Sequence, residues 1–89
     1  MYVMSLRVDI EEGRSDDSLK YLHAEVVPGT KTLPGFVKGM WFGDETNGNA
    51  AIVFDTREHA EDAAANVSSR LVDPVSLRDV SVYELRAEA

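Results

Sequence analysis

The hydrophobic residues of this sequence follow two periods, one typical of strands and one typical of helices. The order in which these periods alternate along the chain constrains the fold more than any other feature. Residues 2–10 place an apolar side chain at every second position, which is typical of a β-strand. Residues 15–33 and 55–71 carry apolar side chains three or four positions apart, which is typical of amphipathic helices. Three more strand-like segments are residues 36–43, 50–54 and 75–85. The sequence therefore predicts the order β-α-β-β-α-β.

This order is that of the ferredoxin-like, or split β-α-β, fold. We expect an α+β protein in which both helices cover one face of a four-stranded antiparallel sheet. A chain of 89 residues is enough for one such domain, spanning residues 1–89. The sequence has no cysteine, which excludes disulfides and thiolate metal sites and fits a reducing compartment.

Local signals predict where the helices and the central turn lie. Pro28 interrupts the first helix, so that helix either ends near Val27 or continues with a kink to about Leu33. We favour the continuation, because the apolar stripe resumes in phase. Ser15 or Asp16 is the predicted N-cap of this helix.

Two further local motifs flank the third strand. Asn47-Gly48 predicts a β-hairpin, because both residues tolerate a positive φ. Asp55 and Glu58 have the spacing of a capping box at the start of the second helix. Alanines in the apolar stripe of that helix predict that it lies close to the sheet.

The net charge of the chain limits the classes of molecule that it is expected to bind. A formal net charge of -7 disfavours nucleic acid and anionic membrane surfaces, which repel an acidic protein. Residues 1–7 lack the features of a secretory signal, and no apolar stretch approaches the ~20 residues that span a bilayer. We therefore expect a cytoplasmic protein.

The predicted strands carry large apolar side chains on both faces. Met40 and Phe42 lie opposite Trp41. In residues 75–85, Leu77 and Tyr83 lie on the face opposite Val82. Helices can cover only one face of the sheet, so the other needs a partner, and a second copy related by a two-fold axis is the simplest one. The sequence thus predicts a homodimer. The alternative is that the C-terminal residues cover these side chains.

Three parts of the sequence resemble a known family. They are P-G-F-V-K-G-M-W at residues 34–41, Asn-Gly at residues 47–48 and A-I-V-F-D-T-R-E-H-A at residues 51–60. The chain resembles the dimeric α/β-barrel proteins related to antibiotic biosynthesis monooxygenases. This resemblance implies that the sheets of two subunits face each other, while each subunit keeps a cleft between its helices and its sheet. The superfamily includes cofactor-free oxygenases, haem-degrading enzymes, isomerases and proteins without a known activity.

The haem-degrading members use an Asn on the first strand, a Trp on the third strand and a His on the second helix. Here residues 2–10 contain no Asn and residues 49–55 contain no Trp. Only His59 lies in a comparable helix. We therefore expect no bound haem, no metal and no other cofactor.

Two histidines are the candidate catalytic residues. His23 shares a helical face with Leu19 and Val26 and is a candidate general base; the alternative is an exposed residue at the helix edge. His59 lies in the first turn of the second helix, where the helix dipole disfavours its proton. A neutral imidazole there is able to accept a proton, and the alternative is a surface residue of the capping region.

Trp41 is the main candidate for substrate binding, because an indole stacks on flat molecules. The alternative is an anchor in the barrel core or the dimer interface. Three weaker candidates are Tyr21, Tyr83 and Asn66.

Three functions remain open from the sequence. The first is a cofactor-free monooxygenase acting on an aromatic or polyketide-like molecule, whose own anion gives an electron to dioxygen. The second is a non-catalytic or stress-related dimer that binds a small molecule in the same cleft. The third is a purely structural dimer whose partner protein matters. The volume and lining of the cleft distinguish them.

Overall fold

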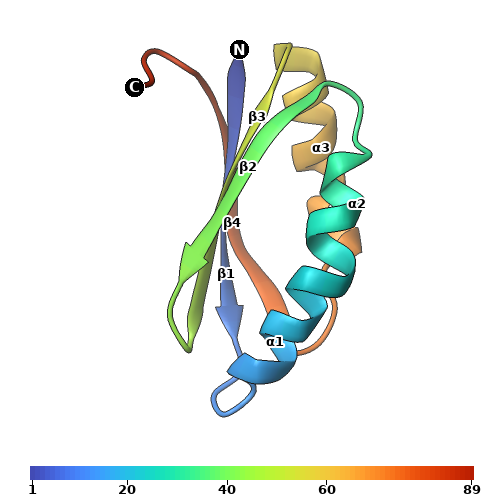
Figure 1. Cartoon of the computed structure of the whole chain (residues 1–89), viewed down its shortest axis with the longest axis vertical. Helices are drawn as coiled ribbons and strands as arrows, with labels where there is room; N and C mark the ends of the chain where they lie inside the picture. Colours follow the sequence, from blue (N-terminus) through green and yellow to red (C-terminus); the bar gives the residue numbers. More distant parts are fainter.

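The computed structural model describes residues 1–89 and confirms the predicted order of strands and helices (Figure 1). The elements are β1 (Tyr2–Ile10), α1 (Ser15–Tyr21), η1 (Leu22–Val26), α2 (Val27–Lys31), β2 (Phe36–Gly43), β3 (Asn47–Phe54), α3 (Arg57–Arg70) and β4 (Val75–Glu84). All neighbouring strands are antiparallel, in the order β2-β3-β1-β4. Figure 1 shows the sheet nearly edge-on, with every helix on one side of it.

The core lies between this sheet and α3. Alternate residues of β1 and β3 face the helices, so that Met4 pairs with Ile52 on this face. Ile52 and Phe54 are completely enclosed, with 1% and 0% of their surface exposed. Ala60 of α3 is also fully buried against them. The small side chain lets α3 lie close to the sheet, as its alanine-rich stripe predicts.

The first helix continues past Pro28, which confirms the favoured alternative. Its distortion is a π-helical turn, η1, that precedes the proline, and the Val27 N–H donates to the Leu22 carbonyl five residues earlier. The residues that join α1, η1 and α2 keep right-handed helical dihedrals. The predicted N-cap is wrong: Arg14 precedes the helix, and no side chain caps it. The Arg14 guanidinium instead pairs with acidic residues on both sides of it: Glu11, Asp17 and Asp73.

The predicted hairpin between β2 and β3 is present, but its turn is not made by Asn47-Gly48. Both of those residues belong to β3, and neither has a positive φ. Asp44 forms the turn, because its carboxylate accepts from the backbone N–H of Thr46 at 3.0 Å and of Asn47 at 2.9 Å. An Asx turn closed by a side chain has replaced the expected tight turn.

A β-bulge changes which residues of β4 face the helices. Asp79 pairs with Arg7, whereas Leu77 pairs with Val8, so one extra residue of β4 lies between the two pairs. Val8 faces the core, and Leu77 therefore shares the helix-facing side with Val80. The simple alternation of the sequence placed Leu77 on the opposite face with Tyr83, which is wrong.

The face of the sheet away from the helices, which we call the open face, keeps large apolar side chains in contact with solvent. Met40, Phe42 and Tyr83 expose 54%, 61% and 60% of their surface. The C-terminal segment runs along the same side in Figure 1, and Glu88 pairs with Lys38 at 3.3 Å. Because Met40, Phe42 and Tyr83 each keep more than half of their surface exposed, the C-terminal segment does not cover them.

Candidate functional site

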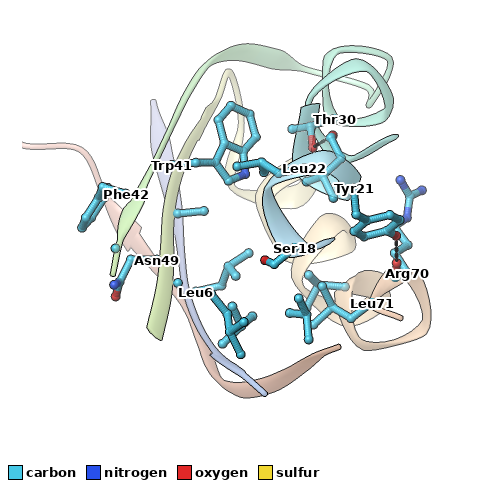
Figure 2. Close-up of a pocket in the computed structure, with 18 of the residues that line it drawn as sticks. Leu6, Ser18, Tyr21, Leu22, Thr30, Trp41, Phe42, Asn49, Arg70 and Leu71 are labelled. Atoms are coloured by element: carbon cyan, nitrogen blue, oxygen red, sulfur yellow. Dashed lines mark hydrogen bonds between the residues drawn. The ribbon is translucent and has the colours of Figure 1, made fainter. Parts of the chain in front are cut away.

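A large cleft separates the sheet from the first helix. It has a volume of about 680 Å³, which is within the ~300–1,000 Å³ range of ligand pockets. Figure 2 shows it with the sheet on one side and α1 and η1 on the other. Its walls are mainly apolar, with Leu6 from β1, Leu22 and Val26 from η1, and Leu71 after α3. A side-chain-filled interface between helix and sheet, expected for a purely structural domain, is absent from this part of the fold.

Trp41 lies in the wall of this cleft. It pairs with Ala50, which faces the helices, so its indole is on the side opposite Met40 and Phe42. A Cβ built on Gly39 would lie 2.9 Å from the indole ring, so the glycine leaves room for the ring above the strand. The indole also packs against the buried core. The structure thus places Trp41 in the cleft rather than on the open face, where an interface anchor would lie.

Hydrogen-bonding groups line the cleft on the helix side as well as on the sheet side. Tyr21 lines the cleft, and its hydroxyl donates to the Arg70 carbonyl at 2.8 Å, which ties the end of α1 to the end of α3 (Figure 2). Thr30 also lines it, and its hydroxyl donates to the Val26 carbonyl at 2.7 Å. Ser18 lies between the two walls in Figure 2.

The sequence analysis missed several of these lining residues. Ser18, Glu25 and Thr30 were not among the candidates, although they share a helical phase with Leu22 and Val26. That phase was the available signal. It was interpreted only as an apolar stripe, because a stripe that packs and a stripe that lines a cleft have the same spacing.

The other candidates lie outside this cleft. His23 is exposed on η1 and does not line it. Tyr83 is on the open face, where 60% of it is exposed. His59 and Asn66 instead line a second, smaller hollow beside α3, with a volume of about 210 Å³. The six candidates therefore divide among the cleft, the hollow and the surface.

In the second hollow, His59 is held by Asp55. Its Nδ1 lies 2.7 Å from the Asp55 carboxylate. The predicted capping box is wrong, because Thr56 rather than Asp55 is the N-cap of α3: its hydroxyl accepts from the His59 N–H at 3.1 Å. The Asp55 carboxylate is directed to the imidazole instead of the first-turn amides.

Gly35 forms the floor beneath this Asp-His pair. Its φ is +78°, and a Cβ at this position would lie 2.2 Å from the Asp55 carboxylate and 2.3 Å from His59 Nδ1. The Asp55 N–H also donates to the Gly35 carbonyl at 2.9 Å. A glycine is thus required here both by the backbone conformation and by the close approach of the two side chains.

The pKa of His59 shifts in the direction opposite to the one that the helix dipole favours. Its hydrogen bond to the Asp55 carboxylate raises the pKa of His59, and the negative charges of Glu58 and Asp62 add to the effect. The same bond lowers the pKa of Asp55. The helix dipole alone favours a lowered pKa, but the carboxylate in direct contact outweighs the dipole and raises the pKa of His59.

The stabilising contribution of this pair is expected to depend on pH. The pKa of His59 is raised, so its contribution is complete below the unfolded value near 6.5 and is lost as the pH rises through the higher folded pKa. The pKa of Asp55 is lowered, so its contribution is complete above the unfolded value near 3.8 and is lost as the pH falls through the lower folded pKa. His59→Gln should thus cost most stability between these two values and least under alkaline conditions. Thermal melts across pH, with an NMR titration of His59, measure this; an equal loss at every pH would contradict it.

The large cleft lacks a histidine that would ligate a haem iron. No histidine lines that cleft, and the Nδ1 of His59 is engaged by Asp55 beside the smaller hollow. No group of three or more His, Cys, Asp or Glu side chains is arranged to hold a metal ion. None of the helices combines the length and apolar character needed to cross a bilayer.

Comparison with known proteins finds similarity at the level of structure. No family model matches the sequence, and no curated protein does. A dimeric ferredoxin-like protein from an uncultured marine organism superposes with a TM-score of 0.67 at 12% identity, covering 100% of this chain and 98% of that one. A candidate antibiotic biosynthesis monooxygenase from Chloroflexus aurantiacus J-10-fl gives 0.63 at 18% identity, covering 99% and 95%.

A third solved structure is a mutant of MhuD with two manganese protoporphyrin IX molecules bound per active site. It gives a TM-score of 0.61 at 15% identity, covering 100% of this chain and 98% of that one. Likeness at these identities establishes the fold. The chain therefore has the ferredoxin-like architecture of these solved structures, which confirms the predicted fold.

Proposed function

We propose that this protein binds a small, largely apolar and flat molecule in the cleft between its first helix and its sheet. The observation that carries the proposal is the cleft itself, about 680 Å³ in volume, with the indole of Trp41 in its wall. Apolar walls with a few polar groups are the usual composition of a small-molecule site. Trp41 supplies a flat surface for stacking, and Tyr21 and Thr30 supply oxygen atoms.

Binding without turnover is the function that this geometry supports best. A general base must come within hydrogen-bond reach of the proton that it removes. His23 is exposed outside the cleft, and His59 opens on the other hollow. The two candidate catalytic residues therefore remain predictions that the cleft does not favour.

A cofactor-free monooxygenase is the second candidate. The apolar walls would exclude water, and a substrate anion would transfer one electron to dioxygen before the two combine. The fold shared with a candidate monooxygenase from Chloroflexus aurantiacus favours it. Oxygen uptake that depends on both a polycyclic phenol and the protein would support this function over simple binding.

The working form proposed here is a homodimer joined through the open face. The exposed side chains of Met40, Phe42 and Tyr83 are the basis for it, together with the similarity to a dimeric ferredoxin-like protein. The interface should be of the size of stable complexes, roughly 1,600 Å² in total. The cytoplasmic location stays a prediction.

The only tryptophan of the chain lies in the cleft, so its fluorescence reports on the site. We expect N-phenylnaphthylamine, a neutral and flat probe, to bind at one molecule per subunit and to quench Trp41 by energy transfer. Ser18→Phe extends a phenyl ring from α1 into the cleft and should weaken the quenching while the melting temperature stays within a few degrees. Asp16→Phe is the matched control, since this residue is exposed on α1 and does not line the cleft. Quenching that does not saturate, or that Ser18→Phe affects no more than Asp16→Phe does, would refute the binding function.

A further inference from the structure

We propose that the cleft selects apolar molecules that carry a single positive charge, namely alkyl- or arylammonium compounds. This inference rests on the proposed binding function and adds the chemical class of the ligand to it. Its basis is the sign of the charges on the cleft walls, taken together with the position of Trp41.

Four charged side chains line the cleft, and three of them are carboxylates. Glu25 lies on the helix side, in η1, whereas Asp44 and Glu45 lie at the turn that ends β2 on the sheet side. Arg70, at the end of α3, is the one positive residue. Carboxylates on both walls leave the cleft with an excess of negative charge.

The single positive residue lies away from the acidic turn. Figure 2 shows Arg70 on the helix side beside Tyr21, whereas Phe42 of β2 lies on the far side of the sheet. Asp44 follows Phe42 by two residues and keeps its charge, because it accepts hydrogen bonds from the backbone N–H groups of Thr46 and Asn47. A molecule near Trp41 therefore has carboxylates at the sheet-side end and on the opposing helix.

The three carboxylates belong to exposed residues that border the apolar walls, so they act on a ligand through a field that salt screens. A low-dielectric cleft lined by charges of one sign concentrates the field and attracts counter-ions. An ammonium group offers three hydrogen-bond donors to carboxylates, and the face of the Trp41 indole attracts cations as well. A carboxylate ligand would lose its hydration and meet charges of its own sign. The net charge of -7 acts in the same direction at long range.

The test compares three probes that differ only in their end group: phenylbutylamine, phenylbutanol and phenylbutyrate. Their binding is read from Trp41 fluorescence excited at the red edge of the indole band, where a phenyl ring does not absorb. We expect the amine to bind most tightly and the acid least, with a ratio on the order of tenfold between them at low ionic strength. Added salt should reduce the ratio.

A triple variant assigns the preference to the cleft. Glu25→Gln, Asp44→Asn and Glu45→Gln together remove the three charges, and asparagine keeps the side-chain oxygen that the turn needs. The ratio between amine and acid should fall to about one. The control variant carries the same change in net charge on three exposed residues that do not line the cleft: Glu12→Gln, Asp16→Asn and Glu61→Gln. It should keep the preference.

The outcomes separate the two proposals. Equal or tighter binding of phenylbutyrate, or a preference that survives the triple variant, would overturn the charge selection while the alcohol still demonstrates binding in the cleft. Failure of all three probes to change Trp41 fluorescence would overturn both the charge selection and the binding function.

Discussion

Phe42→Asp is expected to convert the proposed homodimer into monomers that remain folded. Phe42 lies on the open face with 61% of its surface exposed, so an aspartate there meets only water in the single subunit. In the dimer it would bury a carboxylate in an apolar interface. That should cost about 3 kcal/mol or more of association free energy, which is roughly a hundredfold increase in Kd. Sedimentation equilibrium at micromolar concentration measures the change, and circular dichroism shows whether the fold is kept.

Val72→Asp serves as the control for this experiment. Val72 is a comparably exposed apolar residue, at 47%, but it follows α3 and is not part of the sheet. This variant should sediment as the parent does. A parent protein that is monomeric at micromolar concentration would rule out the dimer, and a Phe42→Asp variant that stays dimeric would move the interface to another surface.

Gly35→Ala should produce the second large effect, a loss of stability centred on the Asp-His pair. The residue has a φ of +78°, and a methyl group would overlap both the Asp55 carboxylate and the His59 ring. A positive φ alone costs roughly 1–2 kcal/mol for a residue other than glycine. Displacement of the two side chains adds to this cost, so the total should be about 3 kcal/mol or more. The imidazole should also lose its raised pKa, which an NMR titration detects.

Gly13→Ala isolates the second part of that effect. Gly13 has a similar φ of +82°, but a Cβ there would contact nothing within 4 Å. Its substitution should therefore cost only the conformational term, and His59 should titrate as in the parent. Equal losses of stability in the two variants would show that the contact between Gly35 and the Asp-His pair contributes nothing.

The sequence predicted the elements better than their ends. Alternation over β1 and the in-phase stripe across Pro28 correctly indicated a strand and a continuous helix, because burial of one face imposes both periods. The β-bulge in β4 was not predicted, because one extra residue moves Leu77 to the other face of the sheet without leaving a signal in the residue types. The turn at Asp44 was not predicted either. Asn47-Gly48 has a strong local preference for a tight turn, but the pairing of β2 with β3 overrides it and places both residues in β3.

For the candidate site, too, the sequence predicted some features and missed others. The alternation of β2 separated Trp41 from Met40 and Phe42, yet it could not distinguish a cleft from a packed core. That distinction depends on how far the first helix stands from the sheet, which residue spacing does not encode. Asp55 and His59 had an informative spacing of four residues, but Asp55 was assigned with Glu58 to a capping box. Several short polar side chains compete for the same helix end, and only the structure shows that Thr56 takes the capping position.

The π-helical turn η1 affects how this sequence aligns with other sequences of the same fold. A π turn holds one residue more than the α-helical turn that it replaces. The two flanking helical segments can therefore keep their orientations in a protein that is one residue shorter between them. An alignment with such a protein needs a one-residue gap within Leu22–Val26. Without that gap, Ser18 would be matched correctly, whereas Thr30, on the same wall of the cleft, would be matched to its neighbour.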